Sequence, residues 1–129
     1  MGSHGVRGVI ARHLDISEHE DATVVRFKGR RLLVDSPHIN GVGSELDALV
    51  DEKDCRNLIV DFTGVADLSN LMLGLLVILR KKMAAKRGQM VLCGLSAEIR
   101  EFFDETLLGE LFEIRDTETD AFLALAYGP

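Results

Sequence analysis

The sequence has no tryptophan, one tyrosine, two prolines and only two cysteines in 129 residues. The cysteines, Cys55 and Cys93, do not have the spacing of a metal or redox site, so we expect reduced thiols without a disulfide or catalytic role. The four histidines are scattered and lack metal-ligand spacing as well. No Ser-His-Asp, Cys-His or paired-carboxylate pattern is evident either. The sequence therefore predicts no metal, no cofactor and no enzymatic activity.

Long apolar runs and positive charge are also scarce. The run 71–79 has about half of the roughly 18 residues that a membrane-spanning helix needs. The N-terminus has no apolar segment typical of a secretory signal. The net charge of -6 and the pI of about 5.1 argue against binding to nucleic acid or an anionic membrane, because both attract positive surfaces. These absences favour a cytoplasmic protein whose partners are proteins.

The composition is that of one folded domain. Apolar residues make up 47% of the chain and the mean hydropathy is +0.12, which is too apolar for a disordered segment. A chain of this length can bury the core of a single domain. The first four residues resemble a remnant of an expression vector. We therefore expect a flexible N-terminus over residues 1–8 and a single domain over residues 9–127.

Strands and helices are predicted to alternate along the chain. We expect strands at 13–18, 22–27, 57–62, 89–93 and 111–114, and helices at 36–52, 69–87, 96–106 and from Thr117 onward. The apolar run 57–62 is typical of a strand covered on both faces. In the helix 96–106, Ile99, Phe102 and Phe103 are expected in the core. Such alternation predicts an α/β fold, with a central mixed, mostly parallel sheet of four to five strands covered by about four helices.

The helix 69–87 has an apolar face expected in the core, and it also has apolar residues on the opposite side. Ser69 is a suitable N-cap, since its hydroxyl can accept a hydrogen bond from the first turn. The residues expected to face the core are Met72, Leu75, Leu76, Leu79 and Met83. Leu71 and Ile78 lie on the opposite side, where polar residues are usual. A neighbouring helix or loop can cover them, they can be isolated exposed residues, or they can form part of a partner-binding surface.

The segment 65–74, V-A-D-L-S-N-L-M-L-G, resembles the helix-start motif of STAS domains, the fold of bacterial anti-sigma factor antagonists. The resemblance continues through the long helix, R-G-Q and the strand M-V-L-C, and covers nearly the whole chain beyond residue 10. In the family the motif is usually Asp-Ser-Ser/Thr-Gly-Leu. Ser69 and Asn70 match the aspartate and the first serine, Leu71 matches the phosphoacceptor, and Met72 matches the glycine. Leu73 alone agrees in type.

The resemblance implies an anti-sigma factor antagonist-like fold and a protein–protein interaction module in bacterial partner switching, which controls transcription. The usual partner is a serine kinase that doubles as an anti-sigma factor. Because Leu71 has no hydroxyl, phosphorylation at the usual site is not expected. The expected partner-binding residues are Leu68, Ser69, Asn70, Leu71, Met72, Gly74, Ile78 and Lys81.

Two alternatives remain open. In one, the chain is a self-assembling signalling scaffold, a homo-oligomer in which Leu71 and Ile78 are buried against a second copy. In the other, it is a sensor domain for a small ligand or nucleotide. A persistent pocket beside the Ser69 helix start, together with measurable ligand binding, would favour the sensor.

Overall fold

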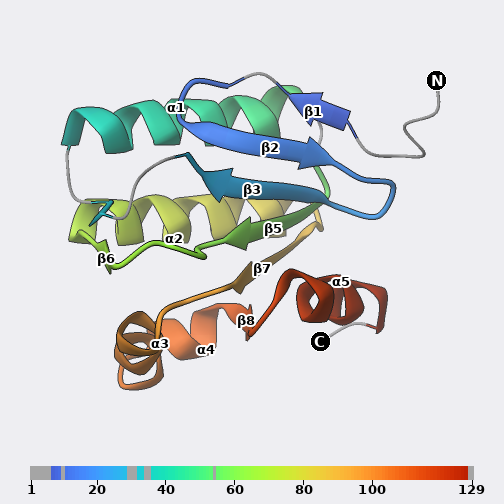
Figure 1. Ribbon diagram of the computed structural model, residues 1–129. Coiled ribbons are helices and arrows are strands. Elements are labelled where there is room, and N and C mark those ends of the chain that lie inside the picture. The colour runs from blue at the N-terminus through green and yellow to red at the C-terminus, as the bar shows by residue number, and fades with distance from the viewer. Residues whose placement is uncertain (1–6, 10, 29–31, 34–35, 54, 128–129) are drawn as a thin grey trace.

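The computed structural model describes residues 7–9, 11–28, 32–33, 36–53 and 55–127, which form a mixed α/β fold (Figure 1). The main sheet has the order β1-β2-β3-β5-β7-β8. Its strands are β1 (Arg7–Val9), β2 (Leu14–Glu18), β3 (Thr23–Phe27), β5 (Asn57–Asp61), β7 (Gln89–Cys93) and β8 (Glu113–Arg115). A separate pair joins β4 (Leu32–Leu33) to β6 (Asp67–Leu68). The helices are α1 (Ser36–Glu52), α2 (Asn70–Ala85), α3 (Ala97–Asp104), α4 (Leu108–Leu111) and α5 (Glu118–Tyr127).

The sheet is mostly parallel, as predicted. β1, β2 and β3 are antiparallel neighbours, whereas β3, β5, β7 and β8 run parallel to one another. Parallel strands need a long crossover, and α1 and α2 provide the crossovers from β3 to β5 and from β5 to β7. Because α2 follows β5 in the chain, the loop between them lies at the carboxyl end of the parallel strands.

Each face of the sheet has its own apolar cluster. Side chains that alternate along the strands point to opposite faces, so β5 contributes Leu58 and Val60 to one cluster and Ile59 to the other. The larger cluster lies between the sheet and the helices α1 and α2, which run side by side (Figure 1). The smaller one lies under α5 and includes Ala121 and Ala124. This two-sided burial explains the continuous apolar run that predicted β5.

Four short elements, β1, β4, β6 and α4, were not predicted from the sequence. β1 adds a sixth strand at the edge of the sheet, and it begins at Arg7, inside the stretch assigned to the N-terminus. The strand expected at 111–114 begins only at Glu113, because Leu111 belongs to α4. The chain turns tightly into α4, since a Cβ added at Gly109 would lie 2.6 Å from the carbonyl oxygen of Phe103.

Candidate functional site

The start of α2 is fixed by local hydrogen bonds. Ser69 has an extended backbone, with φ -87° and ψ 167°, and its Oγ accepts a hydrogen bond from the Met72 N–H at 3.3 Å. This is the predicted N-cap. Just before it, the Asp67 carboxylate accepts a hydrogen bond from the Leu68 N–H at 2.9 Å, and both residues pair with β4. The loop therefore enters the helix in one defined direction.

Most of α2 is occupied by contacts within the domain. The residues buried against the sheet are Met72, Leu76, Leu79 and Met83. On the side of α1, Lys82 forms ion pairs with Asp47 at 3.0 Å and Asp51 at 2.9 Å. On the other side, the Arg80 guanidinium donates a hydrogen bond to the carbonyl of Leu111 in α4. One face of the helix is left over and points outward.

The outward face carries the two apolar residues singled out in the sequence. Leu71 is 43% exposed and Ile78 is 52% exposed, so no helix or loop among the described residues covers them. Gly74 and Lys81 are exposed on the same face. A Cβ added at Gly74 would meet no atom within 4 Å, which leaves the helix backbone open there.

The expected partner-binding residues divide into two groups. Asn70, Leu71, Gly74, Ile78 and Lys81 are exposed on α2, with Leu68 and the Ser69 cap partly exposed just before the helix. Met72 is fully buried, because its position falls on the core face of the helix. Its side chain therefore cannot contribute to a contact surface. We refer below to Leu68, Ser69, Asn70, Leu71, Gly74, Ile78 and Lys81 as the α2 surface.

A cavity of about 410 Å³ lies beside this helix start, between β6, α2 and α3. Its lining residues are Ala66, Asp67, Leu68, Asn70, Leu73, Glu98, Ile99 and Phe102. Phe102 is 45% exposed, so its expected place in the core is wrong: α3 buries Ile99 and Phe103, and Phe102 falls at the edge of that face. The cavity combines an apolar lining with the carboxylates of Asp67 and Glu98. No local sequence pattern predicted this cavity, because residues from three separate elements line it.

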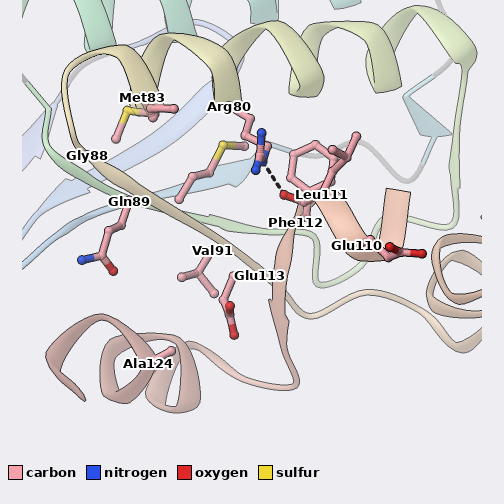
Figure 2. Close-up of a pocket in the computed structure, with 12 residues that line it drawn as sticks. Arg80, Met83, Gly88, Gln89, Val91, Glu110, Leu111, Phe112, Glu113 and Ala124 are labelled. Carbon is pink, nitrogen blue, oxygen red and sulfur yellow. Dashed lines mark hydrogen bonds between the residues drawn. The ribbon is translucent and has the colours of Figure 1, made fainter. Parts of the chain in front are cut away.

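A second cavity, of about 470 Å³, lies near the opposite end of α2 (Figure 2). It is bordered by α2, α4, β7, β8 and α5, with Met83, Phe112 and Ala124 among its lining residues. Two of its charged groups are already engaged, since Arg80 bonds the Leu111 carbonyl and Glu113 pairs with Arg115. The other polar side chains of its lining are Gln89 and Glu110.

A group of charged residues lies between the sheet and the start of α5. Arg26 in β3 donates two hydrogen bonds to the carboxylate of Glu118, at 2.7 and 2.6 Å. Asp61, at the end of β5, is 7% exposed and lies 3.9 Å from Arg26. Its Oδ1 accepts hydrogen bonds from the N–H and the hydroxyl of Thr63, at 2.9 and 2.6 Å. Through Glu118, these contacts hold the amino end of α5 against the sheet.

The two carboxyl groups in this cluster have pKa values shifted in opposite directions. Burial alone raises the pKa of Asp61, but hydrogen bonding with Glu118 and Thr63 and the charge of Arg26 lower it below its ordinary value. Burial and the adjacent Asp61 raise the pKa of Glu118, against the opposing effect of Arg26. Burial and these carboxyl groups also raise the pKa of the Cys93 thiol to about 12. Cys93 is therefore a neutral thiol at neutral pH, which makes it a poor nucleophile.

Two further properties of the described residues bear on other functions. Among residues 7–9, 11–28, 32–33, 36–53 and 55–127, no group of three or more His, Cys, Asp or Glu side chains is arranged to hold a metal ion. Within the same ranges, no helix is long and apolar enough to cross a membrane.

Comparisons with known proteins agree with this architecture. The STAS domain family model matches residues 13–121. The structure is similar to that of an anti-sigma-factor antagonist (STAS) domain protein from Planctomyces limnophilus, with a TM-score of 0.74 and 22% identity over 88% of this chain and 97% of that one. An anti-sigma factor antagonist from Mycobacterium paratuberculosis has a TM-score of 0.72 and 18% identity, covering 97% of each chain.

A third similar structure is the Bacillus cell fate determinant SpoIIAA in its phosphorylated form. It has a TM-score of 0.62 and 15% identity, over 94% of this chain and 99% of that one. At these identities the likeness establishes the fold, and the fold class expected from the sequence is confirmed.

Proposed function

The chain belongs to the STAS domain family, and on that premise we propose that it recognises a protein partner in bacterial signalling, as an anti-sigma factor antagonist does. The proposal rests on the outward face of α2. Leu71 and Ile78 are both apolar and about half exposed there, Leu71 in the first turn of the helix and Ile78 about two turns later. Covering exposed apolar side chains with a partner removes them from water, which favours binding.

The partner in this proposal is a protein of the anti-sigma factor or serine kinase class, and the contact is the α2 surface. Leu71 lies in the first turn of the helix and would form the centre of the contact. The open backbone at Gly74 allows a partner to approach closely. In this role the chain binds its partner and does not catalyse a reaction on it.

The cavity between α2 and α3 extends this surface. Its apolar lining suits a large apolar side chain of the partner, held against Leu73 and Phe102. Asp67 and Glu98 border it, whereas none of the residues that line it is basic. We therefore expect the partner to place a lysine or arginine next to the inserted side chain.

The substitution Leu71→Asp tests the proposal. It places a carboxylate near the amino end of a helix, which is electrostatically favourable for the helix itself, so folding should change little. A contact centred on Leu71 would have to desolvate that carboxylate. We expect the affinity to fall roughly tenfold to a hundredfold, which corresponds to about 1–3 kcal/mol.

The partner is first identified by affinity capture from the native host with the unaltered chain as bait, then purified and titrated by calorimetry. Leu123→Asp is the matched control, because Leu123 is 49% exposed on α5, away from α2. Melting curves report folding separately. Unchanged affinity of the folded Leu71→Asp variant would place the interface elsewhere, and a collapsed melting curve would mean that Leu71 is needed for the core.

A second candidate is supported by the cavity beside Ser69, which is the feature expected of a small-ligand sensor. Asp67 and Glu98 would repel the phosphates of a nucleotide, so a neutral or cationic ligand fits this lining better. The two candidates respond differently to substitution. Leu73→Ala should alter small-ligand binding measured by NMR shifts, whereas Leu71→Asp, which lies outside the lining, should leave it unchanged.

A further inference from the structure

The edge strand β8 pairs with only part of its neighbour β7. Its first residue, Glu113, lies opposite Val91, so no strand among the described residues pairs with Gln89 and Met90 on that side. On the other side, the whole of β7 pairs with β5. The cavity of about 470 Å³ is lined by Gln89, Met90 and Glu113, and it therefore occupies the place where β8 would continue (Figure 2).

The backbone N–H of Met90 faces this cavity. Successive backbone N–H groups of a strand point to opposite sides, and the Gln89 N–H donates toward β5, to the Arg56 carbonyl at 2.8 Å. If β8 continued, the Met90 N–H would donate to the Leu111 carbonyl. That carbonyl lies in α4 and accepts from the Arg80 guanidinium instead.

This N–H is therefore available to a ligand. Met90 is only 8% exposed, and within the ranges that the structure describes its N–H has no hydrogen-bond partner. A buried N–H without an acceptor is unfavourable, so an occupant that brings a carbonyl oxygen next to Met90 is stabilised there.

The walls of the cavity come from both apolar clusters. Met83 and Phe112 belong to the larger cluster, and Val91 and Ala124 belong to the smaller one on the other face of the sheet. Figure 2 shows Met83 and Ala124 on opposite sides of β7. A strand in this position would direct alternate side chains to the two walls. An extended peptide matches the cavity in both respects, because its main chain supplies carbonyl acceptors and its side chains alternate.

The charged side chains of the lining indicate the charge of the occupant. Arg80 bonds the Leu111 carbonyl, and Glu113 pairs with Arg115. Glu110 is exposed and forms no ion pair with another described residue. A lysine or arginine of the occupant would therefore complement Glu110.

We propose that an extended peptide segment of a partner protein binds in this cavity as a short strand beside β7. A main-chain carbonyl of the segment accepts a hydrogen bond from the Met90 N–H, its apolar side chains contact the two walls, and a basic side chain pairs with Glu110. This is strand addition at an unpaired sheet edge. The site lies near the opposite end of α2 from Leu71 and does not depend on the proposed function.

NMR titration of the purified chain with a synthetic peptide is the test. The probe is a blocked pentapeptide of valines with a lysine at each end, so it can bind in either direction. The Met90 amide signal should shift with saturation, and its hydrogen exchange should slow by at least about tenfold. The same peptide with glutamates at both ends should bind more weakly. Leu71→Asp should leave binding of the lysine peptide unchanged, which separates this site from the α2 surface.

Two variants locate the peptide. Ala84→Phe places a large side chain in the cavity and should weaken binding at least about tenfold. Ala85→Phe is the matched control, because both alanines are exposed in the last turn of α2 and only Ala84 lines the cavity. Glu110→Lys should reverse the preference, so that the glutamate peptide binds more tightly than the lysine peptide. Melting curves verify that each variant is folded.

Three results would overturn the proposal. The first is a Met90 amide signal that does not move at millimolar concentrations of the lysine peptide. The second is equal binding by the folded Ala84→Phe and Ala85→Phe variants, which would place the peptide elsewhere. The third is a Met90 signal that shifts with protein concentration alone, because the occupant would then be a second copy of the chain.

Discussion

The residue at position 71 determines whether this helix start offers a hydroxyl at the position of the family's phosphoacceptor. Ser69 and Asn70 are the nearest polar residues in the motif, and the Ser69 hydroxyl is already the N-cap acceptor for the Met72 N–H. Leu71 offers an aliphatic side chain, 43% exposed, in place of a hydroxyl. Its chemistry suits a permanent apolar contact rather than one that a phosphate interrupts.

We therefore predict that a serine kinase captured with this chain, supplied with ATP, leaves the segment 68–73 unmodified. Intact-mass and peptide mass spectrometry are the measurements. Leu71→Ser is the matched variant, since it places a hydroxyl at the family position and should gain phosphate if the kinase still recognises the helix start. Stoichiometric phosphate on Ser69 of the unaltered chain would contradict the prediction, because the acceptor would then have moved along the helix.

The carboxyl group of Glu118 gives a second prediction at this scale. Its pKa is raised above 4.5 by burial and by Asp61, so the folded state holds its proton more tightly than the unfolded state does. Stability from such a group is present at low pH and is lost as the pH rises through its folded pKa. Glu118→Gln removes this loss, although it also weakens the pair with Arg26. Relative to the variant, the unaltered chain should become less stable as the pH rises above about 4.5.

Urea denaturation midpoints measured between pH 4 and pH 8 provide the comparison. Asp61 is present in both proteins, but its lowered pKa depends in part on the hydrogen bond with Glu118, and the stability it contributes is lost progressively below about pH 5. The two profiles are therefore compared above that pH. Parallel stability profiles for the two proteins would show that Glu118 is already ionised throughout, held by Arg26.

The long elements could be predicted from the sequence, and the short ones could not. The helices α1, α2, α3 and α5 and the strands β2, β3, β5 and β7 begin and end close to the expected residues, because apolar periodicity and capping residues are local signals. β4 and β6 have two residues each and exist only because they pair across a long stretch of chain. Local sequence patterns do not predict such long-range pairing.

The same distinction holds for the site. Periodicity placed Leu71 and Ile78 on the side of the helix opposite the core and left open whether another element covers them, and the Ser69 cap followed from its residue type. The cluster of Arg26, Asp61 and Glu118 could not be predicted, since three separate elements bring it together. Position on a helical wheel also failed for Phe102, which falls at the boundary between the buried and exposed faces.

Neighbouring positions on α2 allow a direct test of its orientation. Leu76 is fully buried and Ile78 is 52% exposed. Leu76→Asp should unfold the domain, because it buries an unpaired charge, whereas Ile78→Asp should leave folding nearly unchanged. Ser69→Ala should cost only about 1 kcal/mol, the usual effect of a lost N-cap. Denaturation midpoints provide the measurement. Similar midpoints for Leu76→Asp and Ile78→Asp would mean that the helix is rotated relative to the sheet.

The described part of the molecule is built on one main sheet, whose two faces are covered unequally. The larger cluster under α1 and α2 contains Phe62, Leu76 and Met83. The smaller one under α5 contains Ala121 and Ala124, with Phe122 and Leu125 partly buried against it. The smaller cluster has fewer buried residues than the larger one, so α5 depends more heavily on the contact between Arg26 and Glu118. The face under α5 is therefore expected to open more easily than the face under α1 and α2.

The two cysteines report on these two faces separately. Cys93 is fully buried in the smaller cluster, and Cys55 is 5% exposed in the larger one. With a pKa of about 12, the folded Cys93 thiol is ionised to roughly one part in ten thousand at pH 8, so labelling requires α5 to open.

Ala121→Asp places a charge under α5 and should increase the rate at which a maleimide reagent labels Cys93 by at least about tenfold. Labelling of Cys55 should change little, because the larger cluster stays closed. Peptide mass spectrometry separates the two thiols, and Leu123→Asp, on the exposed side of the same helix, is the control. Equal acceleration at both cysteines would show instead that α5 and the larger cluster open as one cooperative unit.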